Sequence, residues 1–120
     1  MKKYQALALL PGIDKTGIHF SNINASKDVW WLDIPISKIQ SPSHPLLTLV
    51  LHDHRVAKLH VLDVPTAFLL ENFESLSIRE DKDMVSLELS SEESRFLENV
   101  RPQTSGLCFA SFLVNSVSVV

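Results

Sequence analysis

The chain has 120 residues, of which 45% are hydrophobic and 21% are charged, and this composition excludes disordered and fibrous proteins. It predicts a single globular domain over residues 1–120. The formal net charge of −3 disfavours nucleic acid as a partner, and no apolar run approaches the roughly 20 residues that cross a bilayer, so we expect no membrane partner.

The single cysteine, Cys108, excludes a disulfide within the chain and fits a reducing, cytoplasmic location. Its apolar neighbours Leu107 and Phe109 predict a buried, unreactive thiol.

Two short apolar runs predict strands in the first third of the sequence. Residues 4–10 end at a Pro-Gly pair and are short enough for a buried strand. Residues 29–34 are rich in β-branched and aromatic residues and are closed by Pro35. Trp30 and Trp31 are adjacent, so they face opposite sides of this strand, and one of them is expected to be free for an interface.

A β-hairpin is predicted over residues 46–64, after a proline-rich loop at residues 41–45. The alternation of residues favours a register in which His52 faces His60. That register gathers the aliphatic side chains on one face: Leu47, Leu49, Leu51, Leu59 and Val61. It gathers the polar side chains on the other: His52, His54, Lys58 and His60.

The second half predicts two helices. Pro65 opens one over residues 66–76, with an apolar stripe at Leu69, Phe73 and Leu76. The other is predicted over residues 91–100 from the capping-box spacing of Ser90 and Glu93.

Strands are predicted on both sides of the second helix. Residues 77–80 and 84–89 flank a charged turn, and a last strand over residues 107–114 continues to Val117 and Val119. No internal repeat is evident. The predicted fold class is α+β, a mostly antiparallel sheet with two short helices.

The strongest candidates for metal ligands are His52, His54 and His60. Two histidines at i and i+2 on a strand point the same way, and a third from the facing strand completes a set that zinc or iron accepts. The same residues also fit the polar face of an ordinary hairpin. We favour that interpretation, and therefore predict no metal and no cofactor.

A nuclease-like carboxylate cluster is the other catalytic candidate. Glu80, Asp81 and Lys82 have a spacing that some magnesium-dependent enzymes use, with Asp53 or Asp63 as a further acid. A charged hairpin turn explains these three residues more simply. No catalytic residue is predicted, and the three glycines are too far apart for a phosphate-binding loop.

We expect a non-enzymatic protein-binding or interaction module that associates with itself as a homodimer, or with another protein. The C-terminal segment from residue 107 carries no charge, and an uncharged edge strand lacks the usual protection against pairing with another chain. The predicted interface residues are Trp30, Trp31, Val117 and Val119. The alternative is a small metal-dependent hydrolase or nuclease.

Overall fold

The computed structural model describes all residues except 14–16, 42, 44 and 120. Its described part has mixed α+β content, which confirms the predicted fold class. The helices are α1 (Lys3–Ala8), α2 (Ile36–Gln40) and α3 (Thr66–Glu71). The strands are β1 (Ile18–Asn22), β2 (Val29–Pro35), β3 (Leu46–Asp53), β4 (Lys58–Pro65), β5 (Ser77–Arg79), β6 (Met84–Ser90) and β7 (Leu113–Ser118).

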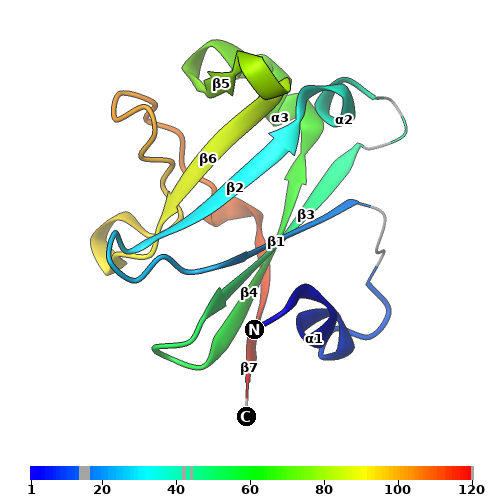
Figure 1. The fold of residues 1–120 in the computed structure, drawn as a ribbon, viewed down its shortest axis with the longest axis vertical. Coiled ribbons are helices and arrows are strands. Elements are labelled where there is room, and N and C mark those ends of the chain that lie inside the picture. The colour runs from blue at the N-terminus through cyan, green and yellow to red at the C-terminus, as the bar shows by residue number, and fades with distance from the viewer. Residues whose placement is uncertain (14–16, 42, 44, 120) are drawn as a thin grey trace.

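The strands form two sheets (Figure 1). The four-stranded sheet has the order β1-β3-β4-β7, in which β1 and β3 are parallel and the other neighbours are antiparallel. The three-stranded sheet has the order β2-β6-β5 and is antiparallel throughout. This order places β7 at an edge of the larger sheet.

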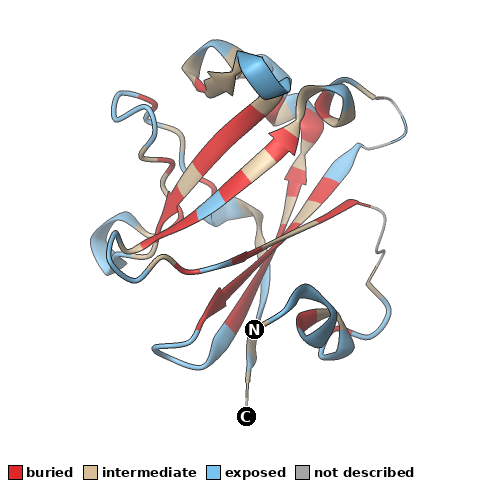
Figure 2. Cartoon of the chain, viewed as in Figure 1, coloured by how far each residue is buried: buried red, intermediate tan, exposed pale blue. Residues whose placement is uncertain are grey.

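The main core lies between the two sheets and contains buried side chains of β2, β6, β3 and β4. Figure 2 shows these four strands as mostly buried. Trp30 is fully buried there, and its Nε1 donates to the His52 carbonyl oxygen over 3.0 Å. A smaller cluster covers the other side of the four-stranded sheet, where α1 contributes Ala6 and the following segment contributes Leu10. The two central strands of this sheet, β3 and β4, are therefore buried on both faces.

Burial on both faces explains why the predicted hairpin register is wrong by one residue. Leu51 faces His60, and His52 faces Leu59. Leu49 and Leu51 face the main core, whereas Leu59 and Val61 belong to the smaller cluster. The aliphatic and polar residues do not separate into a core face and a solvent face, because strands buried on both sides need apolar residues at consecutive positions.

The N-terminal apolar run is a helix and not the predicted strand. Residues 3–8 form α1, which buries Ala6 and leaves Tyr4 and Leu9 exposed. A run this short does not distinguish the two structures by its periodicity. Helix α2, which follows Pro35, was not predicted either.

The predicted helix over residues 66–76 is confirmed in its first part, where α3 spans Thr66–Glu71, but it ends earlier than predicted and is followed by a 3₁₀ turn at Phe73–Ser75. The one predicted over residues 91–100 is wrong, because this segment holds only a 3₁₀ turn at Glu93–Arg95. Ser90 belongs to β6, and its Oγ accepts the backbone N–H of Glu92. The serine therefore makes a local turn at the end of a strand and does not cap a helix.

The C-terminal strand begins later than predicted. Residues 107–112 are irregular and end in a 3₁₀ turn at Ala110–Phe112, so β7 starts at Leu113. Cys108 is exposed, which corrects the prediction of a buried thiol. The charged turn between β5 and β6 is confirmed as a 3₁₀ turn at Glu80–Lys82. Of the predicted loop at residues 41–45, positions 42 and 44 lie outside the described residues.

The structure also contains a repeat of secondary-structure elements that no sequence pattern indicated. The order strand, turn, strand, helix occurs as β1-β2-α2 and again as β3-β4-α3. The second strand ends as Leu32-Asp33-Ile34-Pro35 in one unit and as Leu62-Asp63-Val64-Pro65 in the other. Pro35 and Pro65 have nearly the same backbone angles and each precedes a helix. Helices α2 and α3 contact each other.

Candidate interaction surfaces

Among the described strands, β7 has one neighbour in its sheet, β4. Its side chains are mostly exposed, including Val114 with an exposed fraction of 57%. The chain carries no charged residue after Arg101, so this edge has neither a charge nor a proline of its own. Protein edges usually carry one or the other as protection against pairing with a second chain.

The backbone groups available at this edge belong to Ser116 and Ser118. Val119 donates its N–H to the Ala57 carbonyl oxygen over 2.8 Å, and Val117 faces Leu59 of β4. Hydrogen-bonding direction alternates along an antiparallel strand, so the odd-numbered residues point toward β4 and Ser116 and Ser118 point away. The register shift between Val61 and Leu62 interrupts this alternation near Val114.

A groove of about 420 Å³ lies beside β7, and most of the residues that line it are apolar. One wall is formed by residues 9–13, which follow α1, and the other by β4 and β7. Its lining includes Leu9, Val114 and Val117, with Asn115 and Asp63 as polar members. The edge and the groove together present unpaired backbone groups next to an apolar surface.

The tryptophan pair of β2 divides as predicted. Trp30 has no exposed surface, so its proposed role in an interface is corrected to a role in the core. Trp31 lies on the outer face of the three-stranded sheet and keeps 36% of its surface exposed. Lys27 Nζ lies 5.0 Å and Arg101 Cζ 5.3 Å from its ring centre, as in cation–π contacts.

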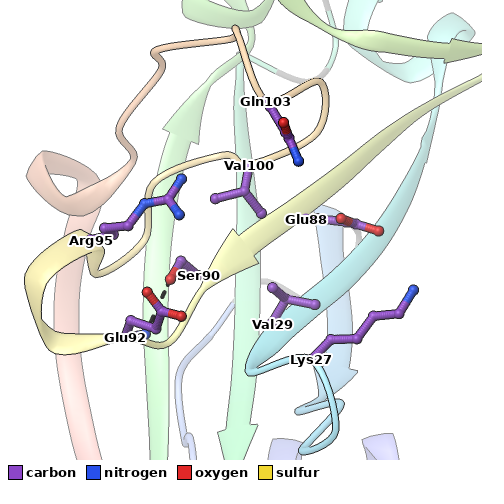
Figure 3. Close-up of a pocket in the computed structure, with 8 residues that line it drawn as sticks. All are labelled: Lys27, Val29, Glu88, Ser90, Glu92, Arg95, Val100 and Gln103. Atoms are coloured by element: carbon purple, nitrogen blue, oxygen red, sulfur yellow. Dashed lines mark hydrogen bonds between the residues drawn. The ribbon is translucent and has the colours of Figure 1, made fainter.

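A polar hollow of about 590 Å³ lies at one end of the three-stranded sheet (Figure 3). Its charged lining alternates in sign, with Lys27 and Arg95 beside Glu88 and Glu92. Ser90, Gln103 and two valines complete the lining. Arg101 does not line the hollow, but its Nη1 lies 3.5 Å from Glu88 Oε1. No sequence pattern indicated this hollow, because its residues come from three separate segments.

The three candidate histidines do not converge. His52 and His60 lie on opposite faces of the four-stranded sheet, as a register shifted by one residue requires, and His54 is exposed in the turn. Among the residues that the structure describes, no group of three or more His, Cys, Asp or Glu side chains is placed to hold a metal ion.

Each of these strand histidines has a structural environment of its own. His60 packs edge-to-face against Trp30 and Phe96, and its Nδ1 lies 2.8 Å from Ser116 Oγ. His52 Nδ1 lies 3.0 Å from Asn22 Oδ1. Burial lowers the pKa of both histidines, because a buried imidazolium loses its hydration.

The carboxylates of the nuclease-like candidate are also separated. Glu80 and Lys82 lie in the exposed turn between β5 and β6. Asp53 is instead paired with Arg55 over 3.0 Å at the β3–β4 turn, and this contact lowers the pKa of its carboxyl. Asp63 accepts a hydrogen bond from Thr48 Oγ1.

No protein-family model matches the chain, and neither do any curated proteins or solved structures. Among the described helices, none has the length and apolar character that crossing a membrane requires.

Proposed function

We propose that the chain is a protein-interaction module that binds through the open edge of β7 and the apolar groove beside it. The observation that carries the proposal is the position of β7, an uncharged strand with a partner on one side only. A strand added to this edge satisfies the backbone groups of Ser116 and Ser118, and its side chains cover the groove.

The first partner that we propose is a second copy of the chain. Strand β7 carries no charge, so pairing two copies of it brings no like-charged side chains of the two strands together. A contact between identical edges is also closed by a two-fold axis, which yields a dimer and leaves no further edge of β7 open.

Removal of one outward-facing N–H group tests the use of this edge. In Ser118→Pro the proline lacks the N–H that points away from β4, so the β4–β7 hydrogen bonds stay intact while pairing with a second chain is impaired. We expect the dimer dissociation constant to rise by at least about tenfold, the equivalent of about 1.4 kcal/mol. Light scattering and sedimentation over a concentration series give this constant.

Ser118→Ala is the matched control, because it changes the same side chain and retains the N–H. We expect it to associate like the unmodified chain, with circular dichroism showing that both variants are folded. A chain that stays monomeric throughout the series, or a proline variant that associates as well as the alanine variant, contradicts the proposal.

Trp31 is proposed as a second contact point, for another protein. Its exposed ring and its two cationic neighbours, Lys27 and Arg101, resemble the aromatic and arginine-rich centres of protein interfaces. A cytoplasmic location also belongs to this proposal. An exposed, unpaired Cys108 fits a compartment in which thiols stay reduced.

A further inference from the structure

We infer that two copies of the chain pair their β7 strands antiparallel about a two-fold axis that passes beside Val117, so that Ser116 of each copy faces Ser118 of the other. This inference rests on the proposed function and specifies its geometry. It identifies the occupant of the apolar groove as the C-terminal part of β7 and Val119 of the second copy.

The hydrogen-bonding direction of β7 selects this register. In an antiparallel pair, two residues that face each other either both point their backbone groups across the pair or both point them away. Ser116 and Ser118 are the outward-pointing residues of the regular part of β7. Pairing Ser116 with Ser118 of the second copy, and the reverse, satisfies both residues in both chains.

In the two neighbouring registers, fewer of the outward-pointing backbone groups of β7 form hydrogen bonds with the second copy. An axis through Ser116 pairs Ser118 with Val114, which lies in the register shift. An axis through Ser118 pairs only Ser118 with its own copy among the outward-pointing residues of β7. The axis beside Val117 keeps the whole contact within the regular ladder.

The side chains fit this register as well. Val117 meets Val117 of the second copy, and Asn115 meets Val119 of the second copy. Because residues 115, 117 and 119 share one face of the strand, Val119 of the second copy lies over the groove that Asn115 and Val117 line. The dimer therefore extends the apolar cluster to which Val117 and Val119 already belong.

Cysteine cross-linking tests the register. Exposed Cys108 is first replaced by serine, so that each variant carries one thiol. In Val117→Cys the two Cα atoms are expected about 4.5 Å apart, which a disulfide spans. In Asn115→Cys, the matched control on the same face, they are expected about 14 Å apart, because the two positions lie four residues apart along neighbouring strands. We expect Val117→Cys to form the dimer disulfide at least about tenfold faster under a glutathione redox buffer.

A second measurement uses a mixture of Asn115→Cys and Val119→Cys chains, which leaves Val117 in place. These positions face each other in the inferred register, so we expect the mixture to form the disulfide dimer faster than either variant does alone, as followed on a non-reducing gel. This arrangement keeps the inference testable if the substitution at Val117 disturbs folding.

Light scattering of the same variants under reducing conditions reports association independently of cross-linking. Dimers that cross-link through Asn115→Cys alone, or through none of these positions, overturn the register and leave the proposed use of the edge intact. Monomers under reducing conditions overturn the register and the proposed self-association together.

Discussion

At the scale of single residues, the buried side-chain amide of Asn99 forms several hydrogen bonds that hold the segment after β6 in place. Asn99 is fully buried, and its Oδ1 accepts the backbone N–H of Glu88 while its Nδ2 donates to Ser105 Oγ and to the Arg101 carbonyl oxygen. These bonds attach the irregular segment after β6 to that strand. A buried polar group that loses its partner costs about 1–3 kcal/mol.

Asn99→Ala is therefore expected to lower the free energy of unfolding by about 2 kcal/mol, since it leaves Glu88 N–H without its acceptor. Urea denaturation gives this value. Gln103→Ala, a change at an exposed position in the same segment, serves as the control and is expected to have little effect. Equal stability of the Asn99→Ala variant and the unmodified chain would contradict this role.

The two tryptophans offer a second comparison at this scale. Trp30→Ala removes a fully buried ring and is expected to cost about 3–5 kcal/mol, whereas Trp31→Ala is expected to cost far less because its ring is partly solvated. Thermal denaturation orders the two variants. The sequence predicted that the pair divides between two faces, but it did not say which ring is inside, because both neighbours along the strand are apolar or aromatic.

At the scale of secondary-structure elements, the β3–β4 hairpin shows how the shifted register arises. Both registers bury Leu51, and its side chain is fully buried in the main core. We expect Leu51→Ala to cost about 2–5 kcal/mol in denaturant unfolding. Leu46→Ala, at the exposed start of the same strand, is the control and should cost far less. Similar losses in both variants would contradict the burial pattern of β3.

The elements that the sequence predicted correctly are those with a strong local signal. Strand β2 has β-branched and aromatic residues and a terminal proline, and α3 has a proline start and an apolar stripe. The missed elements depend on distant contacts. Helix α1 packs over the smaller cluster on the four-stranded sheet. The segment after Ser90 is held in its irregular conformation by backbone hydrogen bonds to β6.

The candidate site could be predicted only in part. The absence of charge from β7 is a local property of the sequence, but its place at the edge follows from the order of four strands. The prediction that His52 faces His60 was wrong for a related reason. A one-residue register shift moves a side chain to the opposite face, and local alternation does not fix the register of a sheet buried on both sides.

At the scale of the whole molecule, buried histidines couple stability to pH. Burial lowers the pKa of His19 to about 4, and the nearby ammonium groups of Lys38 and Lys3 contribute to the shift. The pKa values of His52 and His60 are also lowered. Below the ordinary histidine pKa of about 6.5, the unfolded chain binds more protons than the folded one, so the free energy of unfolding decreases as the pH falls.

We therefore expect the urea midpoint to be constant above about pH 7 and to decrease between about pH 6.5 and pH 4. His19→Gln keeps a polar side chain at this position but does not titrate, so it is expected to reduce this dependence. A midpoint that rises as the pH falls through this window would show that the histidines are charged in the folded chain.

The two strand–turn–strand–helix units have a consequence for folding kinetics. Strands β1 and β3 begin the two units and pair in parallel, so their contact closes only after the chain has passed through β2 and α2. The antiparallel β3–β4 pair, by contrast, is closed by a short local turn. Contacts between residues distant in sequence slow folding, because the entropy of loop closure is lost before they form. The β3–β4 hairpin is thus expected to form early, whereas the β2–β6 and β4–β7 pairs, which join residues even farther apart in sequence than β1 and β3, are expected to form last.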